Sequence, residues 1–157
     1  MLTQVTREGA ASLVLTRRLD AAPGRVWAAL TRADLLTRWM LGPPGWPMVR
    51  CQLAARAGGL MQIEWSDRMG RTLALTGEVI EAEPPWRMLH IERLHLPDPS
   101  PENVVETLLA PDGAGTRLML HMTFPDPAAR DEMLAGGLAE GMEESFVRLE
   151  TLLTEDG

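Results

Sequence analysis

The last twenty residues carry the feature that most limits the fold. Large apolar side chains recur there at steps of four, four, three and four, at Leu138, Met142, Phe146, Leu149 and Leu153. This spacing is that of an amphipathic α-helix with a single apolar stripe. Such a helix must bury its stripe on another element, so the preceding residues have to supply a second layer.

The pattern of the residues before that helix predicts mainly short strands. Leu13, Leu15 and Leu19 fall on one face of a strand at a period of two, and further alternating runs are separated by Gly, Pro and Asp clusters. This order predicts an antiparallel sheet of about six to seven strands, one face of which is buried by the terminal helix. Strands are expected over residues 12–19, 48–53, 61–65, 72–83, 87–96, 103–109 and 116–124.

Two short helices are expected after the first strand, which makes the fold class α+β. Asp20 and Pro23 favour the start of the first helix, as its cap and first-turn residue, and Asp34 favours the start of the second. A further helix is expected after Asp126, and Gly136–Gly137 interrupts it before the terminal helix begins.

Length, composition and charge exclude several classes of protein. A chain of 157 residues suits a single domain, with its core expected over about 12–153. No apolar run reaches the roughly 18 residues of a membrane span, and the amino-terminal residues lack the apolar core of a signal peptide. A cytoplasmic protein without a membrane partner is therefore expected. The net charge of −7 and the absence of lysine argue against nucleic acid as a partner.

Neither a metal nor a cofactor is predicted. The single cysteine, Cys51, excludes an internal disulfide and a thiolate metal cage, and it is expected to be a buried apolar residue. His90 and His95 are five residues apart on one strand, so a period of two sends them to opposite faces. His121 alone offers no set of metal ligands.

Several short motifs follow one another in a characteristic order. They are Arg18-Leu19-Asp20-Ala21-Ala22-Pro23, Leu36-Thr37-Arg38-Trp39 with Gly42-Pro43, Arg56-Ala57-Gly58-Gly59, Gly77-Glu78-Val79, Glu83-Pro84-Pro85-Trp86-Arg87, Gly115-Thr116-Arg117-Leu118 and Gly141 to Leu149. In this order the chain resembles the START-like helix-grip superfamily, also called SRPBCC, in the AHSA-type branch named for homology to the activator of the heat-shock-protein ATPase. The resemblance implies a sheet curved around the C-terminal helix, with a cavity between them.

Four positions depart from the pattern of that branch. Ala54 stands where the branch often has Asp, Met40 where an aromatic residue is common, Met142 where Trp is common and Met122 where many members have His. By resemblance these positions border the cavity, which implies a more apolar and adaptable pocket. The alternative is that the methionines are ordinary gap-fillers of the core.

His90 and Glu92 are the polar residues most suited to a ligand site. They share one face of a strand with Met88 and Leu94. If that face points toward the terminal helix, the pair supplies a polar anchor in an apolar cavity, and it is the candidate for acid/base catalysis. The alternative is a solvated face near the edge of the sheet.

Tryptophan is the dominant aromatic residue, with five copies against two phenylalanines. Trp39, Trp46 and Trp65 are interpreted as a rim at the mouth of the cavity, while core packing is the favoured interpretation for Trp27 and Trp86. Small residues at steps of four along the terminal helix are interpreted as a groove that leaves room for ligand or for close packing. The predicted cavity residues are Trp39, Trp46, Met61, Trp65, His90, Glu92, Met122, Gly141, Met142 and Ser145.

The leading functional hypothesis is a small protein that encloses a hydrophobic or aromatic small molecule between sheet and helix. A second is a cyclase- or hydrolase-type enzyme that acts on such a ligand. A third is stimulation of a chaperone ATPase, which the name of the branch suggests, although the separate amino-terminal region of the eukaryotic activators is not expected here. Homodimer formation stays open, because no sequence feature specifies it.

Overall fold

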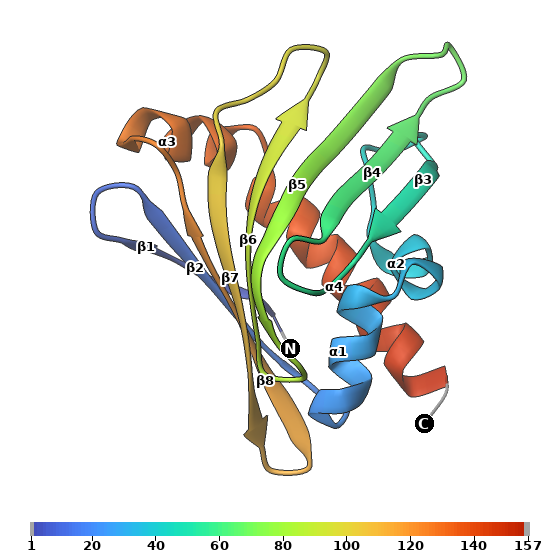
Figure 1. Cartoon of the computed structure of the whole chain (residues 1–157), viewed down its shortest axis with the longest axis vertical. Coiled ribbons are helices and arrows are strands. Elements are labelled where there is room, and N and C mark those ends of the chain that lie inside the picture. The colour runs from blue at the N-terminus through green and yellow to red at the C-terminus, as the bar shows by residue number, and fades with distance from the viewer. Residues whose placement is uncertain (1, 156–157) are drawn as a thin grey trace.

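An eight-stranded antiparallel sheet forms one layer of the protein, and helices form the other (Figure 1). The computed structural model describes residues 2–155. The strand order across the sheet is β1-β2-β8-β7-β6-β5-β4-β3. The elements are β1 (Gln4–Glu8), β2 (Ser12–Leu19), α1 (Pro23–Thr31), α2 (Ala33–Trp39), β3 (Met48–Leu53), β4 (Leu60–Ser66), β5 (Thr72–Glu83), β6 (Arg87–His95), β7 (Asn103–Asp112), β8 (Gly115–Thr123), α3 (Pro127–Ala135) and α4 (Leu138–Glu155).

The predicted α+β sheet-and-helix architecture is confirmed, with one strand more than expected. The additional strand is β1, which pairs with β2 at the edge of the sheet, where Val5 lies opposite Leu15. All but one of the residues of β1 are exposed, so β1 has no apolar face that alternation could reveal. Pairing with the backbone of β2, rather than burial of side chains, therefore defines this strand.

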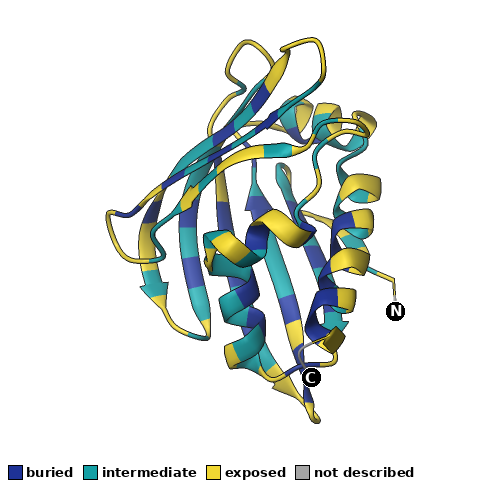
Figure 2. Ribbon diagram, turned by 90° about the vertical axis from the view of Figure 1, so that its right-hand side faces the viewer, coloured by how far each residue is buried: buried dark blue, intermediate teal, exposed yellow. Residues whose placement is uncertain are grey.

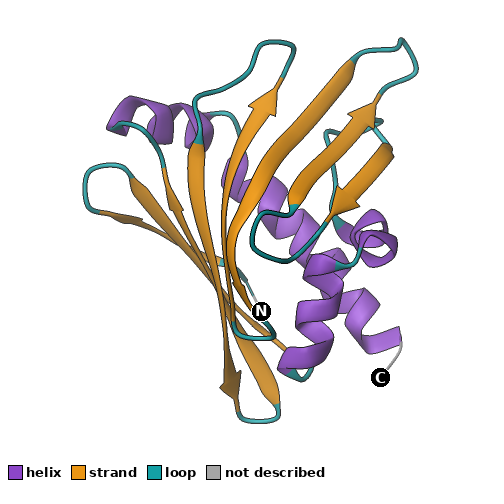
Figure 3. Ribbon diagram, viewed as in Figure 1, coloured by secondary structure: helices purple, strands orange, loops and turns teal. Residues whose placement is uncertain are grey.

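The sheet bends around α4, which crosses its concave face diagonally (Figures 1 and 3). Irregular register in β3, between Met48 and Arg50, and in β5, between Val79 and Glu81, accompanies this curvature. Buried residues alternate with more exposed ones along the strands (Figure 2), and buried residues of β7 and β8 pack with those of α1, α2 and α4. The concave face is therefore the side of the sheet that carries the core.

Local sequence signals explain most of the helix ends. The carboxylate of Asp126 accepts a hydrogen bond from the Ala129 N–H at 2.8 Å and so caps α3. Gly137, with a φ of +97°, separates α3 from α4 as predicted. The expectation that Asp20 caps α1 is wrong, because the cap is Ala22 and Asp20 instead forms an ion pair with Arg18.

Three apolar clusters fill the space between the layers. The α4 cluster centres on Val26, Trp39, Phe146 and Leu149 and joins α1, α2 and α4 to β7 and β8. The α3 cluster consists of Leu13, Leu15, Val105, Met122 and Phe124, against which side chains of α3 pack. The β4–β5 cluster consists of Met61, Ile63, Trp65, Leu73 and Leu75. Partly buried side chains connect these clusters, such as Leu120 between the α4 and α3 clusters and Met40 between the α4 and β4–β5 clusters.

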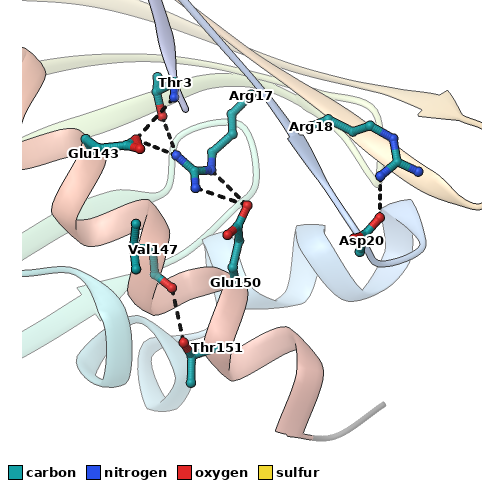
Figure 4. A network of polar contacts seen from close by, with 8 residues as sticks. All are labelled: Thr3, Arg17, Arg18, Asp20, Glu143, Val147, Glu150 and Thr151. Atoms are coloured by element: carbon teal, nitrogen blue, oxygen red, sulfur yellow. Dashed lines mark hydrogen bonds and ion pairs between the residues drawn. The ribbon is translucent and has the colours of Figure 1, made fainter. Parts of the chain in front are cut away.

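A buried arginine attaches α4 to the sheet. Arg17 lies on the concave face of β2 with its side chain only 1% exposed. Its guanidinium binds Glu143 and Glu150 of α4 (Figure 4), with Nε and Nη2 at 3.1 and 3.0 Å from Glu150 Oε1. Nη1 also donates to Thr3 Oγ1 at 2.8 Å. These contacts, called the Arg17 clamp below, fix both the rotation and the axial position of α4.

The clamp also sets the ionisation of Glu143. Burial acts to raise the pKa of its carboxyl, but hydrogen bonds from Thr3 and the positive charge of Arg17 outweigh burial, so the pKa lies below its ordinary value. A carboxyl with a lowered folded-state pKa stabilises the folded chain above its ordinary pKa, and this contribution is lost as the pH falls through the lowered value. Glu143 therefore supports the fold at neutral pH.

Replacement of Arg17 with methionine should destabilise the protein severely. Arg17→Met keeps the apolar stem but leaves Glu143 and Glu150 without their shared cation, which should lower the free energy of unfolding by about 3 kcal/mol. Urea denaturation measures this loss. Arg18→Met is the matched control, because the side chain of Arg18 is partly exposed and pairs at the surface, and it should cost far less. Equal losses in the two variants would contradict the role given to the clamp.

Candidate ligand-binding site

His90 and Glu92 form a hydrogen-bonded pair on the concave face of β6. Nε2 of His90 lies 2.7 Å from Oε1 of Glu92, and their side chains are 8% and 16% exposed. Strand β6 is an inner strand of the sheet, between β5 and β7. The structure thus brings the two residues together on the helix-facing side, away from the sheet edges.

Two further polar residues continue this pair across the sheet. Asn103 of β7 lies directly opposite Glu92, and Thr107 lies opposite Met88, so both share the face of His90. Asn103 and Thr107 are buried. Together His90, Glu92, Asn103 and Thr107 are called the polar band. The sequence analysis did not identify Asn103 and Thr107, although their alternation with Val105 and Leu109 was a signal that could have placed them on the inner face.

One atom of the polar band has no hydrogen-bond partner. Within residues 2–155, Nδ1 of His90 is the one buried side-chain nitrogen or oxygen that is left unpaired. A buried polar atom without a partner costs about 1–3 kcal/mol of stability. An apolar side chain at the position of His90, at the centre of the inner face, would not carry this cost.

The polar band is largely buried and lies between two of the apolar clusters: Val105 of the α3 cluster lies opposite His90, and Met61 of the β4–β5 cluster lies beside Gly77, the partner of Glu92. Strand β6 contributes no fully buried residue to any of the clusters among the described residues. Methionines border this area: Met61 belongs to the β4–β5 cluster, Met122 to the α3 cluster, and Met142 packs against both the α3 and the α4 cluster. Flexible thioether side chains thus surround the polar band, and such side chains adapt to ligands of different shape.

Trp39 and Trp65 are buried and make specific packing contacts. The ring of Trp39 stacks on Phe146 with centroids 6.1 Å apart, and its Nε1 donates to the carbonyl of Ala29 at 2.8 Å. Trp65 Nε1 donates to the carbonyl of Met40 at 3.4 Å. Trp39 thus packs in the α4 cluster and Trp65 in the β4–β5 cluster, so each has a structural role whatever its contact with a ligand.

Trp46 lines an open hollow at the loop between α2 and β3. The hollow has a volume of about 770 Å³ and is bounded by the loop from Leu41 to Pro47, by Asp67 and Arg68 and by Glu144 of α4. The guanidinium of Arg71 lies over the Trp46 ring, 5.4 Å from its centroid. Trp46 also packs against the β4–β5 cluster, so this hollow adjoins that part of the core.

The small residues of α4 do not form one continuous inner groove. Ser145 is buried, and its Oγ accepts a hydrogen bond from the Leu41 N–H at 3.1 Å, which ties the loop after α2 to α4. Gly141 is exposed, and a Cβ built on it would meet no atom within 4 Å. The interpretation of Trp86 as a core residue is wrong, because Trp86 is 46% exposed. Trp27, in contrast, packs against the α4 cluster.

The other residues considered for chemistry are dispersed. His95 lies on the opposite face from His90 and pairs with Thr76 Oγ1 at 2.8 Å. Cys51 is half-buried rather than fully buried, and burial raises the pKa of its thiol. Residues 2–155 contain no group of three His, Cys, Asp or Glu side chains placed to hold a metal ion. None of the described helices has the length and apolar character needed to cross a membrane.

Replacing both members of the His90–Glu92 pair with leucine should not weaken the fold. His90→Leu alone leaves Glu92 nearly buried without a partner and should lower the free energy of unfolding by about 2 kcal/mol. The double variant His90→Leu/Glu92→Leu removes both polar groups and should be as stable as the wild type or more so, by about 1–3 kcal/mol. Urea denaturation distinguishes these cases. A double variant as unstable as the single one would show that the pair serves the fold itself.

Comparisons with known proteins place the chain in a family. The family model for activator of Hsp90 ATPase homolog 1-like protein matches residues 20–154. A crystal structure of a Rhodobacter sphaeroides protein is 37% identical, covers 99% of both chains and has a TM-score of 0.93. A Nitrosomonas europaea protein is 26% identical over 93% of this chain and 96% of its own, with a TM-score of 0.79.

More distant structures share the fold. A Mycobacterium smegmatis protein is 21% identical, covers 100% of both chains and has a TM-score of 0.87. No curated protein matches the sequence. Because the family model matches well over half of the chain, the protein belongs to the family of activator of Hsp90 ATPase homolog 1-like proteins.

Proposed function

We propose that this protein binds an apolar or aromatic small molecule between its sheet and α4, with His90 and Glu92 as the polar anchor. The observation that carries the proposal is the buried Nδ1 of His90, which has no hydrogen-bond partner on the inner face of the sheet. Apolar walls with a few placed polar groups are the usual composition of small-molecule sites. Family membership and fold are consistent with binding, but neither fixes the ligand.

The energetics of the polar band favour a site over a purely structural element. Burial of a carboxylate and an imidazole costs free energy that packed apolar side chains would not. The hydrogen bond between His90 and Glu92 offsets part of this cost, and the unpaired Nδ1 leaves a part that a ligand can recover. The polar band is therefore explained more simply by binding than by stability.

The hollow at Trp46 is the proposed entrance. Its wall includes the prolines and glycines between Leu41 and Pro47, and Trp46 connects it to the β4–β5 cluster. The N–H of Leu41 donates to Ser145 of α4, and Trp65 Nε1 donates to the carbonyl of Met40. These two hydrogen bonds attach the start of the loop to α4 and to β4. Movement of the loop and of the bordering methionines would open a path from solvent to the polar band.

Titration with neutral naphthalene derivatives, followed by tryptophan fluorescence, tests the proposal. A saturable change is expected, because Trp65 belongs to the cluster beside the polar band. Affinity should fall at least about tenfold in His90→Leu/Glu92→Leu, since the anchor is lost. Gly141→Leu is the matched control and should bind as the wild type does, because its new side chain faces open space. A wild type that gives no saturable change, or equal affinity in all three proteins, would refute the proposal.

A second candidate function is catalysis by the same pair. A histidine hydrogen-bonded to a carboxylate at 2.7 Å is an arrangement suited to general acid–base chemistry, and cyclase- or hydrolase-type reactions of a bound ligand would use it. Turnover that is lost in Glu92→Gln while ligand affinity is unchanged would support this function. Bound ligand recovered without chemical change would exclude it for that ligand.

The family name raises chaperone stimulation as a third candidate. The name of the matching model refers to activation of the Hsp90 ATPase, and this activity comes to the present chain only as a proposal. A pull-down with the middle domain of that chaperone tests it directly. Retention of the protein would favour an interaction role, and an empty pull-down would count against that role and leave ligand binding and catalysis.

A further inference from the structure

The hydrogen bond between His90 and Glu92 determines which atom of the imidazole carries the proton. A carboxylate only accepts hydrogen bonds, so Glu92 Oε1 at 2.7 Å places the proton of the neutral ring on Nε2. The second nitrogen, Nδ1, then keeps its lone pair. The unpaired atom is therefore an acceptor, and the partner that it lacks must be a hydrogen-bond donor.

The positions directly opposite His90 supply no such donor, and Asn103 and Thr107, which lie diagonally across on β7 and carry donor groups, make no hydrogen bond to Nδ1. Val79 of β5 and Val105 of β7 lie directly opposite His90 on its two sides, and both are aliphatic. Met88 and Glu92 precede and follow His90 on the same face of β6, and Glu92 already occupies Nε2. A donor for Nδ1 has to come from the space above the sheet, on the side of α4.

We propose that the ligand is a neutral molecule that donates a hydroxyl or N–H hydrogen to Nδ1 of His90, as an alcohol, a phenol or an amide does. The inference rests on the proposed binding function and names the chemistry that the site selects. The rest of the ligand must be apolar, because the side chains around His90 are the buried, apolar ones of Val79, Val105 and Met88. The carboxylate of Glu92 beside the ring disfavours an anionic ligand, because two negative charges in a nearly buried site repel each other.

Isothermal titration with three probes of the same ring system tests the selection. The probes are 2-naphthol, which donates, 2-methoxynaphthalene, which does not, and 2-naphthoate, which is anionic. The wild type should bind 2-naphthol about tenfold more tightly than the methyl ether, the effect of one hydrogen bond to a buried acceptor. It should bind 2-naphthoate more weakly than 2-naphthol.

Two substitutions at His90 separate the roles of the two ring nitrogens. The amide of His90→Gln reaches the position of Nε2 and can still donate to Glu92, but it leaves nothing at Nδ1, so the preference for naphthol over the ether should disappear. His90→Asn places a carbonyl near the position of Nδ1 and should restore part of the preference. His95→Gln is the matched control on the same strand and opposite face, and it should keep the full preference.

The outcomes distinguish failure of this inference from failure of the proposed function. Equal affinity for naphthol and its ether, together with loss of both in His90→Leu/Glu92→Leu, would keep the binding function and overturn the donor inference. A preference for naphthoate would overturn it as well, because it would mean that Nδ1 carries a proton. If neither naphthol nor the ether binds the wild type, both the binding function and the donor inference are overturned, and Nδ1 is satisfied by water alone.

Discussion

The position of α4 on the sheet depends on the Arg17 clamp, and the rest of the arrangement follows from that position. Eight strands spaced about 4.8 Å apart span roughly 34 Å, whereas one helix is about 10 Å wide. A single helix cannot cover such a face, so α1, α2 and α3 close parts of it that α4 leaves open. Arg17 holds α4 to β2 through Glu143 and Glu150, and the polar band lies farther along the same face of the sheet, on β6 and β7.

That band includes three buried polar side chains, those of His90, Asn103 and Thr107. The three apolar clusters meet its margins through methionines, and the polar band lies between them with one acceptor unsatisfied. A core selected only for stability would carry aliphatic residues at these positions. Under the proposed function, a ligand that completes the core explains why oriented polar atoms, one of them unsatisfied, are buried at this place.

Much of the fold could be predicted from the sequence, because periodicity reports which residues share a face. The apolar stripe of α4 and the alternation in β2 and β8 predicted the two layers. The period of two correctly placed His90 and Glu92 on one face of β6 and His95 on the other. Periodicity could not decide which face of β6 meets the helices, since Leu89 and Ile91 are as apolar as Met88 and Leu94. The pairing of β6 with β7, which puts His90 opposite the core residue Val105, determines which face is buried. Strand β1, the clamp of Arg17 and the packing of Trp39 likewise depend on partners distant in sequence.

Native mass spectrometry of the protein purified from its own host tests directly whether a ligand completes the core. The wild type should retain a neutral small molecule, Gly141→Leu should retain it too, and His90→Leu/Glu92→Leu should be folded but free of it. An adduct of equal abundance on all three proteins would place the ligand away from the polar band. A wild type without any adduct, folded and with its clamp intact, would contradict the view that a ligand completes this core.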